Sequence, residues 1–335
     1  MKKQIIAALL CSALVAVSCK KDKTQTPVDL SEVFIAGTET DNVTGKETST
    51  VWKNGIINSQ AISTSHAYAR SVFVDGSDVY TTGYEIDGES KWKVWKNGTV
   101  LYTYFDGEPT DGNAIAVSGG DVYTAGHFFS PGLYKHYAVS FKNNQPVMLT
   151  DGNQQAEALG IAVSGSDVYV AGYYGNEARL WKNGVIETLN SASGYWGTAV
   201  TIKGSDVYVI GYSQSAPLKI RMWKNGIPTD IASGSGDAWG KSIAVADNND
   251  VYIAGQEILN GKWAARLWKN GTATTLNDGT KFAFANAVTV KGNDVYVAGI
   301  ERDANNILEY VRVWKNGTAV FSNTSRSKAF GIFVK

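Results

Sequence analysis

Asp294-Val295-Tyr296-Val297-Ala298-Gly299, followed about fifteen residues later by Trp314-Lys315-Asn316-Gly317, is one of the clearest copies of a pattern that recurs along the whole chain. Successive copies begin 39 to 46 residues apart. A fixed period of this length indicates a repeat architecture in which each unit is one supersecondary element. Six copies of Asp-Val-Tyr-x-x-Gly and a degenerate seventh begin at Asp78, Asp121, Asp167, Asp206, Asp250, Asp294 and Glu32.

Each unit reads as four short strands. A small-x-small-apolar-x-apolar segment such as Gly112–Val117 comes first, and a Ser-Gly turn leads from it into Asp-Val-Tyr-x-x-Gly. The third strand ends at Trp-Lys, and Asn-Gly then supplies the positive φ angles of a tight hairpin into the fourth strand. Four strands in a period near 44 residues predict a β-propeller rather than a helical solenoid.

The two ends of the repeat region predict how the ring closes. The segment Ala329–Val334 has the pattern of a first strand, and no second strand follows it. The missing second strand stands at the other end of the repeats, Glu32–Gly37. We therefore expect an all-β fold, a seven-bladed propeller of four-stranded blades, in which the C-terminal strand pairs with the N-terminal strands and removes an exposed sheet edge.

The repeats also carry a family resemblance. Ile-Ala-Val, a turn and Asp-Val-Tyr-x-Ala-Gly resemble the bacterial "seven-bladed β-propeller" repeat family found in secreted proteins, over residues 32–335. This resemblance implies the fold and little about activity, because propellers host many functions.

The N-terminus has a different character. Lys2 and Lys3 precede an apolar run, Ile5–Val17, which is too short to span a bilayer and predicts a secretory signal. Ser18-Cys19 ends it in a way that resembles the signal of bacterial lipoproteins, which are cut before a cysteine that is then lipidated. We expect a signal peptide over residues 1–18, a lipidated Cys19 with a polar tether over 19–31, and the propeller over 32–335. The expected location is the cell envelope, anchored by lipid to the outer membrane and facing the periplasm or the surface.

Charge and motifs exclude several classes of function. Lys plus Arg and Asp plus Glu both total 31, so no nucleic-acid partner is expected. No phosphate-binding loop, nucleophile elbow or zinc spacing is present, and no cofactor or metal is predicted. His66, His127 and His136 fall in or beside expected variable loops, and the spacing of the last two matches no metal motif.

The repeated residues have structural explanations. The repeat tryptophans are expected to pack between blades, the Asp that opens each second strand to cap its own turn, and the Lys before each Asn-Gly to form a solvated ring. Trp92 stands where other units have small or apolar residues, and we assign it to the core. The repeat tryptophans are Trp52, Trp95, Trp181, Trp223, Trp268 and Trp314, with Phe141 in the seventh unit.

Binding is expected on the face with variable loops, since function commonly resides in loops on a rigid scaffold. The residue before each first strand should form the rim of that face: Tyr68, Asp111, Glu157, Trp196, Trp239, Phe284 and Lys328. Two residues further on, a second set should line the mouth of the central channel: Arg70, Asn113, Leu159, Thr198, Lys241, Asn286 and Phe330.

An aromatic arc on this rim, formed by Trp196, Trp239, Phe284 and the loop residue Trp263, is not required by the repeat and suggests a ligand. The sequence favours a non-catalytic module that binds a glycan or a protein through the arc, Asp111, Glu157 and Arg70. Two alternatives stay open: a carbohydrate hydrolase or lyase that uses Asp111 and Glu157 as a carboxylate pair, and a purely structural scaffold.

Overall fold

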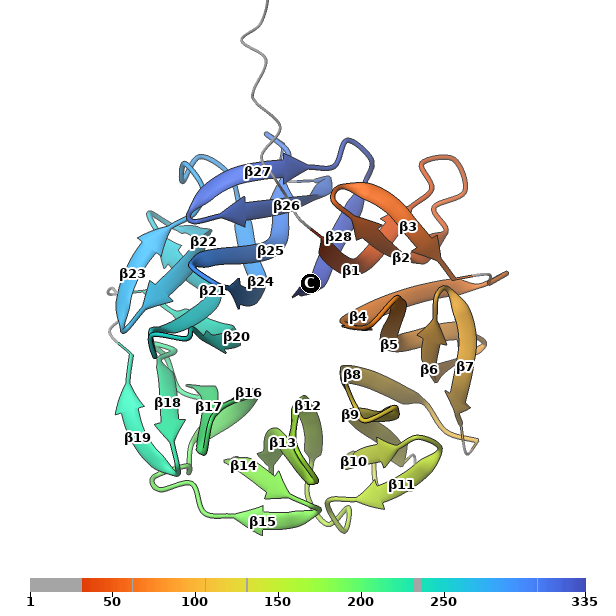
Figure 1. Cartoon of the computed structure of the whole chain (residues 1–335), viewed down its shortest axis with the longest axis vertical. Coiled ribbons are helices and arrows are strands. Elements are labelled where there is room, and N and C mark those ends of the chain that lie inside the picture. Colours follow the sequence, from red (N-terminus) through yellow and green to blue (C-terminus); the bar gives the residue numbers. More distant parts are fainter. Residues whose placement is uncertain (1–31, 62, 106, 131, 232–235, 306) are drawn as a thin grey trace, which may run out of the picture.

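Seven four-stranded antiparallel sheets surround one central axis in the computed structural model (Figure 1). The structure describes residues 32–335 except 62, 106, 131, 232–235 and 306. The all-β, seven-bladed prediction is therefore confirmed. Among these described residues, no helix has the length and apolar character needed to cross a membrane. The expected signal peptide, lipidated Cys19 and tether lie outside the described residues.

The strands follow the sequence from the axis outward in six of the seven blades. The blade that closes the ring contains β28 (Ser327–Val334), β1 (Val33–Thr40), β2 (Glu47–Lys53) and β3 (Ile56–Gln60). The next three contain β4 (His66–Asp75), β5 (Asp78–Asp87), β6 (Glu89–Lys96) and β7 (Thr99–Tyr104); β8 (Thr110–Ser118), β9 (Asp121–Ser130), β10 (Lys135–Lys142) and β11 (Gln145–Met148); and β12 (Ala156–Ser164), β13 (Asp167–Tyr174), β14 (Glu177–Lys182) and β15 (Val185–Glu187). The last three contain β16 (Tyr195–Lys203), β17 (Asp206–Ser213), β18 (Ile220–Lys224) and β19 (Ile227–Asp230); β20 (Ala238–Val245), β21 (Val251–Leu259), β22 (Lys262–Lys269) and β23 (Thr272–Thr275); and β24 (Ala283–Lys291), β25 (Asp294–Arg302), β26 (Glu309–Lys315) and β27 (Thr318–Ser322).

The Asn-Gly turns between third and fourth strands adopt the expected left-handed geometry. Asn316 has a φ of 51° and Gly317 a φ of 81°, as a type I′ hairpin requires. The Asn side chain has a second role, because its Oδ1 accepts a hydrogen bond from the backbone N–H of the second strand. In the last blade the N–H of Val295 donates to Asn316 Oδ1 at 2.8 Å.

The Asp that opens each second strand binds the Lys and Asn of the neighbouring hairpin. Asp250 lies 2.8 Å from Lys269 Nζ, accepts a hydrogen bond from Asn270 Nδ2 at 2.7 Å and accepts another from Asn248 of its own turn at 2.8 Å. These contacts lower the pKa of Asp250 to about 2. The same Lys lies 5.6 Å from the ring of Tyr252. The expected lysine ring is therefore charge-balanced, with each Lys paired to an acid: Lys53–Glu32, Lys96–Asp78, Lys142–Asp121, Lys182–Asp167, Lys224–Asp206, Lys269–Asp250 and Lys315–Asp294.

The repeat tryptophans lie between blades, as predicted. Trp314 of β26 is buried among Ala254, Ala265 and Leu267 of the preceding blade. Trp52 of β2 packs in the same way against Val311 of β26. Burial of such large side chains at every blade junction accounts for much of the apolar area that holds the ring together.

One junction uses a different pair of residues to fill the same space. Phe141 replaces the repeat Trp, and fully buried Trp92 of the preceding blade lies against it at a centroid distance of 5.1 Å. The Trp92 indole N–H donates to Thr82 Oγ1 at 2.8 Å. At Gly112, an added Cβ would overlap the Trp92 indole. Trp92 is thus a core residue, as predicted.

A β-bulge interrupts every innermost strand at the same point. In β8 the register shifts between Gly112 and Ala114, so Asn113 has no partner in β9. Opposite each bulge stands the Gly of the Asp-Val-Tyr-x-x-Gly segment, where an added Cβ would overlap the carbonyl oxygen of the rim residue, as at Gly126 with Asp111. Bulges re-aim a side chain locally. Here they separate the rim residues from the residues of the channel.

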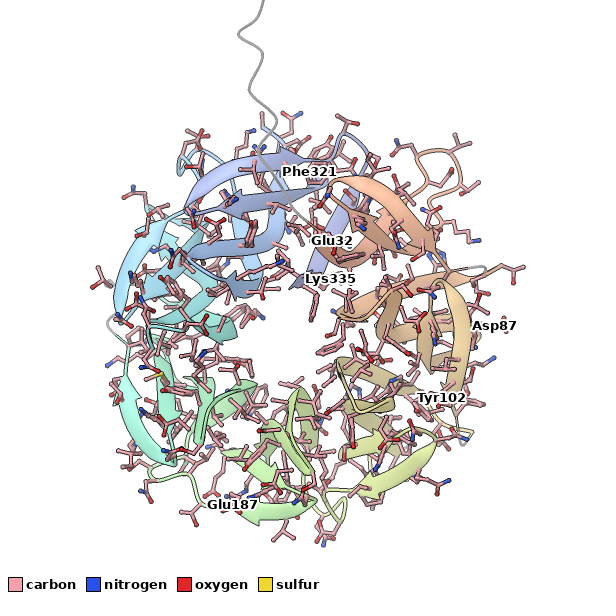
Figure 2. All side chains as sticks on the ribbon, viewed as in Figure 1. Glu32, Asp87, Tyr102, Glu187, Phe321 and Lys335 are labelled. Carbon is pink, nitrogen blue, oxygen red and sulfur yellow. The ribbon has the colours of Figure 1, made fainter. Side chains whose placement is uncertain are left out.

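The closure of the ring follows the prediction. β28 pairs antiparallel with β1, for example at Ile332 with Ile35. Beyond the strand, the N–H of Lys335 donates to the carbonyl of Glu32 at 3.1 Å. Figure 2 shows Glu32 and Lys335 close to the axis, whereas Glu187 and Phe321 lie on the outer part of the disc. The two ends of the described chain therefore meet in one blade.

Candidate functional site

The predicted rim residues lie within the first residues of the innermost strands rather than before them. Asp111 is in β8, Trp196 in β16 and Trp239 in β20. Trp263, expected in a loop, lies in β22, and His127 lies in β9. The strands extend further toward this face than the sequence suggested, because cross-strand pairing continues past the repeated Gly.

The bulge residues line the central channel, as the sequence analysis expected. They surround a cavity of about 180 Å³. Two of them are cations, Arg70 and Lys241, and no carboxylate is among the described residues that line the cavity. Burial lowers the pKa of Lys241, and the charge of Arg70 lowers it further. Because two basic side chains and no described carboxylate face this cavity, an acidic group that enters it would pair with Arg70 and favour the charged form of Lys241.

Arg70 is held by aromatic rings. Its guanidinium lies 5.2 Å from the Tyr84 ring and 4.9 Å from the Phe330 ring, and Nη2 donates to the Tyr84 hydroxyl at 3.2 Å. Its Nε is buried and has no hydrogen-bond partner among the described residues. Lys241 lies 5.2 Å from the Trp239 ring, and no carboxylate pairs with it in the described part of the chain. Both cations thus keep capacity for an anion.

The aromatic arc is a continuous series of ring contacts. Trp239 and Trp263 stack at a centroid distance of 5.0 Å and an interplanar angle of 26°. Tyr212 lies 5.7 Å from Trp239 and 6.3 Å from Trp196. Trp196 in turn stacks on Tyr173 at 4.2 Å and 11°. The three tryptophans are half-buried, so part of each ring reaches solvent.

Phe284 stands apart from this series. Its ring lies 5.5 Å from the guanidinium of Arg302, and the ring contacts within the described residues do not join it to the tryptophans. The indole nitrogens of Trp196 and Trp239 are buried without hydrogen-bond partners there. The arc therefore offers ring surface rather than indole N–H groups.

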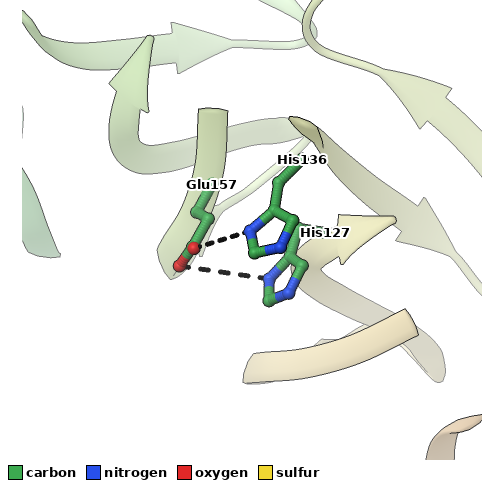
Figure 3. Close-up of side chains that lie close together, drawn as sticks. All are labelled: His127, His136 and Glu157. Atoms are coloured by element: carbon green, nitrogen blue, oxygen red, sulfur yellow. Dashed lines mark hydrogen bonds and ion pairs between the residues drawn. The ribbon is translucent and has the colours of Figure 1, made fainter. Parts of the chain in front are cut away.

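Glu157 lies at the centre of a cluster with two histidines (Figure 3). His136 Nδ1 is 2.9 Å from one carboxylate oxygen, and His127 Nδ1 is 4.0 Å from the other. The two imidazole rings stack at 4.2 Å and 16°. Tyr173 pairs with Glu157 across the β12–β13 ladder and stacks on Trp196, so it connects the cluster to the aromatic arc.

The environment keeps Glu157 ionised. Burial by itself raises the pKa of Glu157, but the hydrogen bond from His136 and the charge of His127 outweigh it, and the net pKa is lowered. Burial lowers the pKa of His127, although the Glu157 carboxylate opposes this shift. Burial and the Glu157 charge both raise the pKa of Tyr173.

Asp111 lies beside the cluster. It pairs in register with His127 of β9, and it accepts a hydrogen bond from Ser90 Oγ. A glycosidase pair needs one carboxyl group with a raised pKa to act as the acid. The pKa of Glu157 is shifted in the opposite direction, so this residue suits a base or a ligand of a cation rather than a proton donor.

Sequence reasoning did not include Tyr173 or Tyr212 in the site, and it named His127 and His136 without assigning them a role. The two tyrosines directly follow the repeated Gly172 and Gly211, and His127 directly follows Gly126. These positions pair with rim residues across the first ladder, as Trp196 does with Tyr212. The position after the repeated Gly was therefore the signal that could have found Tyr173, Tyr212 and His127, whereas His136 does not occupy this position.

Comparisons with known proteins add the fold alone. No protein family matches the sequence, and no curated protein does. A solved protein from Lactobacillus plantarum is 12% identical, with a TM-score of 0.52 over 90% of this chain and 98% of that one. The computationally designed Ika8 protein is 15% identical, with a TM-score of 0.45 over 81% of this chain and 92% of that one.

Proposed function

We propose that this protein is a non-catalytic binding module that holds a glycan on the rim of the channel. The arrangement that supports this most strongly is the stack of Trp239 on Trp263 immediately beside the cationic channel. Sugar rings present C–H faces that pack on aromatic rings, together with hydroxyl groups that need polar partners. The rim provides both kinds of surface within one blade and its neighbours.

The charges favour an acidic glycan over a neutral one. Arg70 and Lys241 face a cavity without carboxylates among its described residues, and Arg70 Nε lacks a partner there. A uronate or another acidic substituent entering the cavity would pair with these cations, while a neighbouring sugar ring rests on the arc. Asp111 is positioned to accept hydrogen bonds from sugar hydroxyls near His127.

Three alternative functions are distinguished by the experiment below. In the first, an acidic protein segment occupies the same surface. In the second, the protein is a hydrolase or lyase that uses Asp111 and Glu157, and in the third it is a scaffold that binds nothing at the rim. The arc and the cation pair favour the glycan over the protein segment. The lowered pKa of Glu157 disfavours its use as a general acid.

Truncation of the arc tests the binding site. An array of neutral and acidic glycans and peptides first identifies the ligand. We expect Trp239→Ala and Trp196→Ala each to lower the affinity for the glycan found there by thirtyfold or more, since loss of a stacking hot spot costs about 2 kcal/mol. Arg70→Gln should weaken only acidic ligands. Affinities are measured by calorimetric titration of each folded variant.

Trp181→Phe is the matched control for these tryptophan variants. Trp181 is a repeat tryptophan between blades, and in one unit the equivalent position holds Phe141, where Trp92 fills the remaining space. The Trp181→Phe variant should therefore lose stability but bind the ligand with the affinity of the parent protein. If both arc variants bind with native affinity, the binding site lies elsewhere. Binding of a peptide and no glycan on the array would favour the acidic protein segment as ligand. Cleavage of the ligand would show that the protein is an enzyme.

The proposal includes a lipid anchor at Cys19 and a place in the cell envelope. It rests on the resemblance of Ser18-Cys19 to a lipoprotein signal and of the repeats to those of secreted bacterial propellers. Two or more acyl chains on one Cys give stable retention, at about 0.8 kcal/mol per buried methylene.

Substitution of this cysteine tests the anchor. Cys19→Ala is expected to prevent labelling with radioactive palmitate and to leave the protein unprocessed or in the soluble fraction, whereas Cys11→Ala should stay membrane-bound. Protease treatment of intact cells then separates surface from periplasmic exposure. Membrane retention and labelling of Cys19→Ala would contradict the anchor.

A further inference from the structure

We propose that His127, His136 and Glu157 form a binding site for one divalent transition-metal ion of the Zn²⁺ type. One ring nitrogen of each histidine and a carboxylate oxygen of Glu157 all lie within 4.8 Å of one another. Zinc bonds to His nitrogen and to carboxylate oxygen at about 2.0–2.2 Å, so ligands around one ion stand roughly 3–3.6 Å apart. Binding of one ion by all three groups therefore requires the side chains to rotate so that their ligand atoms approach one another.

The backbone holds the three ligands in place independently of a metal. His127 and His136 lie on the hydrogen-bonded strands β9 and β10, where His127 pairs with Ala138, two residues from His136. Glu157 comes from β12 of the next blade, where it pairs with Tyr173 just before the bulge. Each ligand therefore sits on a paired strand of a closed ring, which makes the site more precise than one on loops.

The polar groups of the cluster are incompletely satisfied without a cation. His127 Nδ1 is buried and has no hydrogen-bond partner among the described residues. The imidazoles stack at 4.2 Å, and the Nδ1 atom of each lies near a carboxylate oxygen of Glu157, at 2.9 Å for His136 and 4.0 Å for His127. Two imidazoles and one carboxylate in such proximity form a set of ligand groups that Zn²⁺ accepts.

The surroundings supply the outer contacts that metal sites use. The Tyr173 hydroxyl interacts with Glu157 and helps to lower its pKa, and partners of this kind orient metal ligands. The backbone N–H of His136 donates to Gln155 Oε1 at 3.0 Å, which fixes the strand that carries this imidazole. Three protein ligands leave a fourth position for water or for an oxygen of a bound molecule. The site would then place a Lewis acid next to the aromatic arc, but its existence does not depend on glycan binding.

The test uses the purified protein after removal of its affinity tag and dialysis against EDTA. Titration with ZnCl₂ should give one ion per chain, and CoCl₂ should give the visible absorption of tetrahedral cobalt. We expect His127→Ala, His136→Asn and Glu157→Gln each to weaken Zn²⁺ binding about 100-fold or more, because even outer-contact changes cost 10–100-fold. Tyr173→Phe should weaken Zn²⁺ binding by about 10–100-fold.

His66→Ala is the matched control. His66 also lies on a strand of the same rim with Nδ1 near a carboxylate, 3.8 Å from Glu47, yet it is outside the cluster. It should bind Zn²⁺ like the parent. Zn²⁺ should raise the melting temperature of the parent and of His66→Ala, but not that of the three ligand variants. Absence of one-to-one binding by the parent, or undiminished affinity in folded ligand variants, overturns the proposal.

Discussion

Removal of residues 329–335 is expected to abolish cooperative folding of the propeller, the largest effect of any change considered for this protein. The deletion takes most of β28, the innermost strand of the closing blade, and leaves β1 unpaired on that side. Ala329 is fully buried with Val33 and Ile35, and Ile332 packs against the same cluster.

The expected loss is comparable with the whole stability of a domain. Each apolar side chain removed from the core costs roughly 1.5–3 kcal/mol, and an exposed strand edge promotes association between chains. A typical domain has about 5–15 kcal/mol in total. Asn286 of the neighbouring blade also loses its bond to the Ala329 carbonyl, at 2.8 Å.

Thermal unfolding followed by circular dichroism and light scattering measures the effect. The control removes Lys335 alone, which lies beyond the end of β28 and should leave the transition sharp. If the longer deletion melted as sharply and at as high a temperature as the parent protein, pairing of β28 with β1 would not be needed to close the ring.

Trp92→Ala is expected to lower the free energy of unfolding by about 3–5 kcal/mol, the usual cost of truncating a buried Trp. Trp92 has no exposed surface and contacts both Tyr104 and Phe141 edge to face. The variant would leave a cavity at the one blade junction where the repeat Trp is replaced by Phe. Urea denaturation gives the free energy directly.

The double variant Trp92→Ala with Phe141→Trp should recover a large part of this loss, because it restores the arrangement found at the junction of Ala138 and Trp181. Phe141→Trp alone should instead destabilise by about 1–3 kcal/mol through overpacking against Trp92. Simple additivity of the two substitutions would show that the two side chains do not share one space.

The sequence by itself determined the fold because the same strand and turn patterns recur, with small variations, in all seven repeats. Asn-Gly at 54–55 or 316–317 favours a hairpin with left-handed backbone angles. The near-continuous apolar run after Asp294 fits a strand that is buried on both faces. The order of strand types at the two ends of the repeats determined the closure of the ring. The sequence also distinguished Trp92 from the candidate ligand-binding residues, since the other repeats mostly have small or apolar residues at the equivalent position of the third strand.

The candidate site depended on contacts that no repeat encodes. The sequence predicted the rim and channel positions, but it placed His127 in or beside a variable loop and Trp263 in a loop. It also expected each repeat Asp to cap its own turn. Those errors share one cause, because a strand's last pairs and a side chain's partner depend on the neighbouring strand and not on its own sequence. His127 and Glu157 stand 30 residues apart. Only the packing of β12 against β9, with a bulge that turns Leu159 to the channel and keeps Glu157 on the rim, brings that carboxylate to two imidazoles.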